Sequence, residues 1–181
     1  MIDQKLIEQC RQGNIESFRK VIEASSPFAY SVAFKMLGDE DLARDVVQET
    51  MITIWKKIGH IRTAQGYKTW LYRIVVNKCY DEFRKARRRP EVLAAESTWV
   101  RLSATISENG ADEFTDSEIS VIISKLTERL SPRQKAVFVL SELEEMTNEE
   151  IAGITGMSKT SIKANLYHAR KSFKEMLSKY L

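Results

Sequence analysis

The sequence predicts an all-α fold of two small helical domains joined by an acidic, flexible linker. The 181-residue chain contains only seven glycines and three prolines, and few of its apolar residues alternate with polar ones as they do in strands. Two short helical patterns near the C-terminus pivot on Gly156, as in a helix-turn-helix. Charge is also divided into blocks along the chain. A hydrophobic content of 43% is enough for a packed core.

The charge blocks define the expected domains. Residues 1–90 carry 17 Lys and Arg against 11 Asp and Glu, residues 91–116 carry one against six, and residues 117–181 carry ten against eight. The acidic middle block lacks sustained periodicity and is interpreted as a tether between domains at 1–90 and 117–181. A short helix around residues 92–102 is an alternative for part of it.

The first domain begins with two expected helices, at residues 3–11 and 14–37, which Gly13 separates. Pro27 is expected to kink or interrupt the second helix. Asp39 caps a third, amphipathic helix, and its expected inward residues are Leu42, Val46, Ile54, Trp55 and Ile58. Its outward face carries Asp41, Asp45, Gln48, Glu49 and Ile52. An outward Ile beside acidic and polar residues suggests a protein partner, although an ordinary solvated face explains it equally well.

A loop at residues 59–68 and a long helix at residues 69–89, stopped by Pro90, are expected next. The helix ends in a cluster of five cations with no acid between them: Arg84, Lys85, Arg87, Arg88 and Arg89. Such a cluster repels itself unless phosphates lie nearby. Tyr67, Trp70 and Tyr72 near its start could stack on single-stranded bases, or Trp70 and Tyr72 could belong to the core.

The second domain shows two capping boxes, Ser131 with Gln134 and Thr147 with Glu150. Ser158 caps the second helix of the helix-turn-helix. The polar side of that helix carries Lys159, Thr160, Ser161, Lys163, Asn165, His168 and Arg170, which are donors of the kind that reach base edges and phosphates in a major groove. A solvated helical hairpin is the plain alternative.

Several classes of function find no support. Cys10 and Cys79 are far apart and are interpreted as buried thiols, so neither a disulfide framework nor a metal site is expected. No apolar run could span a bilayer, and the N-terminus lacks a signal-peptide layout, so we expect a cytoplasmic protein without membrane insertion. With only two histidines and no nucleophile constellation or Gly-rich phosphate loop, no enzyme and no cofactor are expected.

Three segments in order resemble bacterial sigma factors of the extracytoplasmic function (ECF) group. They are residues 45–55, residues 69–77 with the Arg cluster that follows, and the terminal helix-turn-helix. The resemblance covers nearly the whole chain. It implies that residues 1–90 form sigma region 2 and residues 117–181 form sigma region 4. It also implies three partners: core RNA polymerase, through its β′ clamp helices and β subunit; promoter DNA; and an anti-sigma factor.

The resemblance also implies roles for residues in promoter-specific transcription initiation. Asp45, Gln48, Glu49 and Ile52 would dock on the β′ clamp helices. The melted minus-ten strand would be captured by Arg62, Tyr67, Lys68, Trp70, Arg73, Asn77, Arg84, Arg87 and Arg88. The polar residues 159–170 named above would read the minus-thirty-five duplex. Asn165 and His168 stand where many relatives have Arg, so the resemblance does not determine which bases this helix reads.

Two alternative functions, each of a different class, remain. A sigma mimic that keeps the fold but sequesters a regulatory partner would be expected to lose its basic residues, whereas this chain retains them. A stand-alone helix-turn-helix regulator would account for the last 65 residues but not for the first 90.

Overall fold

The structure is a computed structural model that describes residues 2–88 and 116–178. Every regular element within these two stretches is a helix, which confirms the all-α prediction. The expected tether and the alternative helix at residues 92–102 lie outside the described residues. The domain boundaries at residues 90 and 117 therefore stay predictions.

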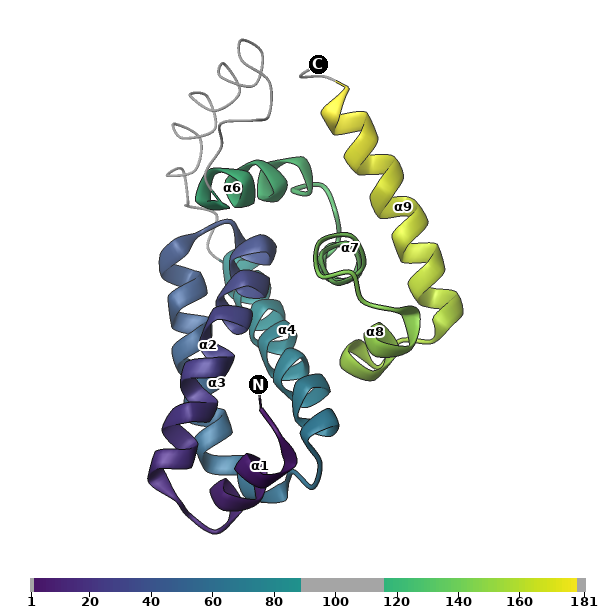
Figure 1. Cartoon of the computed structure of the whole chain (residues 1–181). Helices are drawn as coiled ribbons and strands as arrows, with labels where there is room; N and C mark the ends of the chain where they lie inside the picture. The colour runs from purple at the N-terminus through teal and green to yellow at the C-terminus, as the bar shows by residue number, and fades with distance from the viewer. Residues whose placement is uncertain (1, 89–115, 179–181) are drawn as a thin grey trace.

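The N-terminal domain is a helical bundle (Figure 1). It consists of α1 (Gln4–Arg11), α2 (Ile15–Leu37), α3 (Glu40–Lys57), the 3-10 turn η1 (Ile58–His60) and α4 (Ala64–Arg88). The side chains of Asp3, Asn14 and Asp39 each accept a hydrogen bond from the backbone N–H three residues on, at the starts of α1, α2 and α3. These local caps fix where the helices begin, and those at Asn14 and Asp39 are the ones that the sequence predicts.

Two expectations for this domain are wrong in detail. Helix α4 starts at Ala64, so residues 64–68, expected in the loop, form its beginning. The Thr63 hydroxyl accepts a hydrogen bond from the Gly66 backbone at 3.0 Å and marks this start. Helix α2 also continues through Pro27, so the interruption that was one of the two expected effects does not occur; a kink at Pro27 stays a prediction. Buried residues on both sides of it, among them Val21 and Val32, anchor both halves in one core, which offsets the lost backbone hydrogen bond.

The C-terminal domain contains the expected helix-turn-helix. Its elements are α6 (Asp116–Leu126), α7 (Pro132–Phe138), the π-helical turn η2 (Val139–Leu143), α8 (Asn148–Thr155) and α9 (Lys159–Leu177). Both capping boxes form as predicted. Gly156 ends α8 with a φ of 72°, a left-handed conformation that glycine adopts without steric cost, and Ser158 caps α9.

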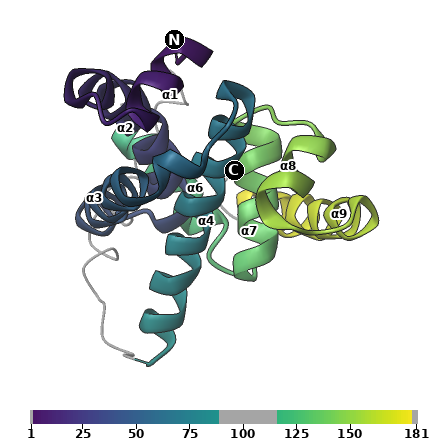
Figure 2. The same ribbon diagram turned by 90° about the horizontal axis from the view of Figure 1, so that it is seen from below.

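The two domains share one hydrophobic core. Seen from below, α4 lies between α2 and α3 on one side and α7, α8 and α9 on the other (Figure 2). Val32 and Val76 from the first domain belong to the same buried cluster as Leu140 and Ile151 from the second. A smaller cluster joins α7 to α9, where the rings of Phe138 and Phe173 stack at 4.9 Å.

Both cysteines are buried and free, as predicted. Burial raises the pKa of the Cys79 thiol to about 12. Burial also raises the pKa of Cys10, so burial favours the protonated form of both thiols.

Candidate nucleic-acid and protein interfaces

The acidic-polar strip of α3 lies outward as predicted. Asp45, Gln48, Glu49 and Ile52 are all exposed, and 47% of Ile52 is accessible to solvent. Lys78 of α4 donates a hydrogen bond to Glu49 at 2.8 Å, which lowers the pKa of that carboxyl. Glu49 is thus positioned by its neighbour, and the strip presents an ionised acid beside an amide and an aliphatic side chain.

Trp55 extends this strip, which corrects its expected inward position. Its side chain is 56% exposed, and its ring meets Phe18 of α2 edge-on, with centroids 4.5 Å apart. The expected Val46 and Ile54 do lie inward, where they are joined by Ala43 and Thr50. Leu42, also expected inward, is 37% exposed. Reading the small residues Ala43 and Thr50 as core would have placed the helix face correctly.

A shallow hollow of about 400 Å³ adjoins the strip between α2 and α3. It is lined by Ser26, Pro27, Tyr30, Arg44, Val47 and Gln48. Gln48 belongs to both the hollow and the strip. The exposed face of α3 therefore offers a continuous surface of mixed apolar and polar character, of the kind found in protein interfaces.

On α4 and the turn before it, five of the nine residues expected to contact the minus-ten strand are exposed: Arg62, Lys68, Arg73, Asn77 and Arg84. Arg84 forms an ion pair with Asp81 of its own helix. The side chains of Arg87 and Arg88 lie outside the described residues, although the backbone of both belongs to α4.

Tyr67 differs from the expectation because it is a core residue. Its side chain is 2% exposed, and its hydroxyl shares a 2.7 Å hydrogen bond with Ser25 of α2. Burial raises its pKa to about 12. Trp70 packs beside it at 6.0 Å between ring centroids and is half-buried, while Tyr72 is 5% exposed. In this structure only Trp70 among the three aromatics retains surface on which a base could stack.

Lys68 and Arg73 also contact the second domain. The ammonium of Lys68 lies 3.8 Å from the carboxylate of Glu150, and the guanidinium of Arg73 donates a hydrogen bond to the carbonyl oxygen of Gly153. Both partners belong to α8. The same side of α4 therefore carries candidate DNA contacts and holds the neighbouring domain.

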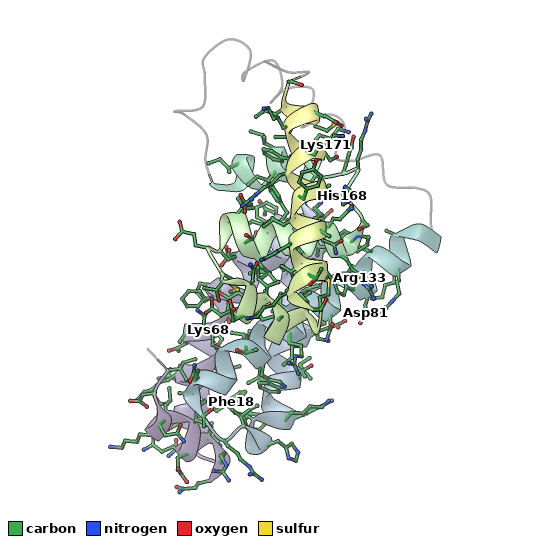
Figure 3. The ribbon with its side chains drawn as sticks, turned by 90° about the vertical axis from the view of Figure 1, so that its right-hand side faces the viewer. Phe18, Lys68, Asp81, Arg133, His168 and Lys171 are labelled. Carbon is green, nitrogen blue, oxygen red and sulfur yellow. The ribbon has the colours of Figure 1, made fainter. Side chains whose placement is uncertain are left out.

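The polar side of α9 is largely exposed. His168 and Lys171 lie along the helix, at the opposite end of the molecule from Phe18 (Figure 3). Lys159, Thr160, Lys163, His168 and Arg170 are exposed, whereas Ser161 and Asn165 are half-buried. The Asn165 amide donates to the Ser161 carbonyl at 2.7 Å and to its hydroxyl at 3.3 Å.

Two cations of α9 are held by acids of the second domain. Lys159 pairs with Glu149, and Arg170 pairs with Glu142 at 2.8 Å. These hydrogen bonds lower the pKa of both carboxyls, so both acids stay ionised at neutral pH. The pairs orient the two cations along the exposed face of α9.

Tyr167 is a candidate contact that the sequence interpretation missed. Its side chain is 66% exposed, and with Lys163 and Arg170 it borders a hollow of about 450 Å³ between α9 and the start of α8. Residues 160, 163, 167 and 170 recur at spacings of three and four, so they share one helix face. That spacing could have identified Tyr167 from the sequence.

The stretches at residues 2–88 and 116–178 contain no group of three or more His, Cys, Asp or Glu side chains placed to hold a metal ion. They also contain no helix that is both long and apolar enough to cross a bilayer.

Both domains match families of known proteins. Residues 21–89 match Sigma-70 region 2, and residues 120–173 match Sigma-70, region 4. The ECF RNA polymerase sigma factor SigW of Bacillus subtilis (strain 168) is 24% identical over 184 residues, a span that covers 98% of this chain and 97% of that protein.

Solved structures share the fold. CnrH in complex with the cytosolic domain of CnrY aligns with a TM-score of 0.69 at 21% identity, covering 97% of each chain. The sigma factor RpoE from Bartonella quintana, in complex with the anti-sigma factor NepR, aligns with a TM-score of 0.65 at 21% identity, covering 91% of this chain and 98% of that one.

Proposed function

We infer the function from the family: this chain belongs to the extracytoplasmic function group of RNA polymerase sigma factors. We propose that it binds core RNA polymerase in the cytoplasm and directs promoter-specific transcription initiation. In this proposal α9 reads the minus-thirty-five duplex and α4 captures melted minus-ten bases. The observation that carries it is the presence, in one chain, of an acidic-polar strip on α3 and cationic faces on α4 and α9.

Core polymerase docks, in this proposal, on the strip formed by Asp45, Gln48, Glu49 and Ile52. Its partners are the β′ clamp helices, with the β subunit as a further contact of the chain. Trp55 adds a half-exposed aromatic side chain beside Ile52, and aromatic anchors contribute disproportionately to interface energies. Phe18 holds that ring in place, so little side-chain entropy is lost on binding.

The minus-thirty-five duplex contacts the exposed face of α9. Lys163 and Arg170 supply phosphate contacts, and Tyr167 adds a hydroxyl between them. Thr160 and His168 are further contacts on the exposed side of the helix. Asn165 can make a bidentate contact to adenine only if its amide gives up the hydrogen bonds to Ser161.

The minus-ten strand follows α4 from Arg62 toward Arg84, and Arg87 and Arg88 continue this path in sequence. Trp70 is the stacking surface, and Asn77 donates to an unstacked base. Stacking of a base on an aromatic side chain contributes about 1 to 3 kcal/mol of binding free energy. This gain offsets the free-energy cost of opening the duplex locally.

An anti-sigma factor is a further proposed partner. The two structural relatives were solved with CnrY and with the anti-sigma factor NepR. The hollow between α2 and α3, whose accessible lining is mainly apolar, provides a surface for such a protein.

Reconstituted transcription tests the function. The full chain is added to bacterial core polymerase on a library of promoter variants, and the start sites of the transcripts are sequenced. We expect initiation from a defined subset of promoters that depends on the added chain. A sigma mimic would instead leave the library silent while still binding a regulatory protein, and that result would overturn the proposal.

A further inference from the structure

The segment that leads into α4 has no helix of its own. Ile61, Arg62 and Thr63 lie between η1 and α4 without regular structure. Arg62 and Thr63 are exposed, whereas Ile61 is half-buried and packs against the core. Short segments of this kind are more mobile than the helices they join, unless other groups fix their backbone. The position of Arg62 therefore depends on what holds the peptide groups around it.

One side chain holds the backbone on both sides of Thr63. The amide nitrogen of Gln4 donates a hydrogen bond to the carbonyl oxygen of Arg62 at 2.8 Å, and its amide oxygen accepts one from the backbone N–H of Ala64 at 3.1 Å. A primary amide carries a donor and an acceptor in one planar group, so Gln4 pairs with both backbone groups at once. The Ala64 N–H lies in the first turn of α4, where the helix itself offers no acceptor. These two bonds form the Gln4 clamp.

Helix α1 provides a fixed base for the Gln4 clamp. It lies at one end of the N-terminal bundle, against the turn that leads from α3 to α4 (Figure 1). Ile7 and Cys10 of α1 are buried in the main core. The Ser17 hydroxyl donates a hydrogen bond to the side-chain oxygen of Gln9 at 2.8 Å and joins α1 to α2. Because α1 is held in this way, Gln4 transmits the position of the bundle to residues 61–64.

Thr63 is tied to α4 from the other side. Its hydroxyl accepts a hydrogen bond from the Gly66 backbone N–H at 3.0 Å, and its carbonyl oxygen accepts one from the Tyr67 backbone N–H at 3.0 Å. The residues on either side of Thr63 are bonded to α1 through Gln4. The segment is thus held between two helices while the Arg62 side chain stays exposed.

We propose that Gln4 is a positioning residue for the minus-ten strand, because its clamp holds residues 61–64 in the shape that receives the melted bases. The inference rests on the proposed function, since it requires Arg62 and the start of α4 to contact that strand. A segment already held in its binding shape loses less conformational entropy when the strand binds, so more of the contact energy serves to distinguish bases. Gln4 needs no contact with DNA and acts through the backbone of Arg62 and Ala64.

Amide hydrogen exchange of the full chain tests the clamp without DNA. In Gln4→Ala the Ala64 amide loses its acceptor, and we expect it to exchange about fivefold faster, the factor that corresponds to one typical hydrogen bond. The Gly66 amide, which bonds Thr63, reports whether the start of α4 unfolds and should be unaffected. The matched control is Gln12→Ala, because Gln12 is an exposed glutamine at the other end of α1. An unchanged Ala64 rate would overturn the proposal.

Holoenzyme binding to a library of premelted promoters tests the effect on recognition. The non-template minus-ten bases and the minus-thirty-five base pairs are varied, and the bound variants are sequenced. We expect Gln4→Ala to reduce the preference among minus-ten bases about fivefold. The minus-thirty-five preference and the affinity for core polymerase should stay at their wild-type values, whereas a general loss of stability would lower all three. Gln12→Ala should match the wild type in each measurement.

Gln4→Glu separates the two bonds of the clamp. An ionised carboxylate still accepts from the Ala64 N–H but cannot donate to the Arg62 carbonyl oxygen. We therefore expect wild-type exchange at Ala64 and a minus-ten preference between those of the wild type and Gln4→Ala. If Ala64 exchanges faster in Gln4→Ala while the minus-ten preference is kept, the positioning role is overturned and the sigma function stands. If the wild-type holoenzyme shows no promoter preference at all, the proposed function itself fails, so the two failures give different results.

Discussion

The ring of Trp55 meets the ring of Phe18 edge-on, with 4.5 Å between centroids, while more than half of the Trp55 side chain stays exposed. An aromatic side chain that is held in place yet accessible has already lost much of its conformational entropy before it binds a partner. Because Trp55 lies on the same face of α3 as Ile52 and Gln48, this pair belongs to the proposed docking surface for core polymerase.

Trp55→Ala should weaken binding to core polymerase by about 2 kcal/mol, the loss typical of an interface hot spot. The melting temperature should change little, because more than half of the Trp55 side chain is already exposed in the free chain. Fluorescence titration of core polymerase with labelled full-length chain measures the affinity. The control is Ile15→Ala, which removes a 73% exposed apolar side chain from α2. Equal affinities for the Trp55 variant and the wild type would remove Trp55 from the interface.

Lys163→Ala should weaken promoter binding evenly across sequences. Lys163 is exposed on α9 beside Tyr167 and Arg170, where it is placed to neutralise one phosphate. Loss of one phosphate contact lowers the slope of log affinity against log salt by about 0.9. Holoenzyme binding to promoter DNA is measured between low and moderate salt. The control, Lys20→Ala, removes the same charge from an exposed position of α2 and should leave the slope unchanged. If the wild type and both variants show the same slope, Lys163 does not contact a phosphate.

Asn165→Ala should alter base preference more than overall affinity. The Asn165 amide hydrogen-bonds Ser161 in the free chain, and exchanging these bonds for adenine would couple recognition to a side-chain rotation. A good bidentate contact discriminates against the wrong base by about 1 to 3 kcal/mol. Sequencing of bound promoter variants measures the preference at each position. A uniform loss over all variants would instead indicate that Asn165 only stabilises the start of α9.

The local elements of this fold were predictable because their signals lie within a few residues of one another. The caps at Asp3, Asn14 and Asp39 each bond a backbone group three residues away. The same is true of the capping box at Thr147, so the helix-turn-helix could be identified from its own residues. The outward strip on α3 followed from helical periodicity alone.

The contacts that join distant segments were not predictable from these rules. The residues next to Tyr67 in the sequence indicate a loop. In the structure, however, Tyr67 lies in the core, where its hydroxyl hydrogen-bonds Ser25, 42 positions away. Lys35 and Glu144 are separated by 109 positions, and no spacing rule relates them. The closed arrangement of the two domains depends on such pairs, so it could only be found in the structure.

Stability should rise with pH between about 7.5 and 9 because of Lys135. This lysine is 5% exposed, with its ammonium 3.2 Å from the Ser124 hydroxyl and 5.8 Å from the ring centre of Phe83. Burial lowers its pKa from 10.5 to about 8. Between these two values the unfolded chain binds more protons than the folded chain, so the free energy of unfolding increases as pH rises through 8.

The expected gain is about 1 kcal/mol between pH 7.5 and 9, measured by urea unfolding of the full chain. The window ends near pH 9 because burial raises the pKa of Cys79 from 9.0 to about 12, and that thiol destabilises the fold at higher pH. Lys135→Met keeps the length of the side chain but removes the titrating group, so its unfolding free energy should not rise over this range. Parallel pH profiles for the variant and the wild type would show that Lys135 does not titrate there.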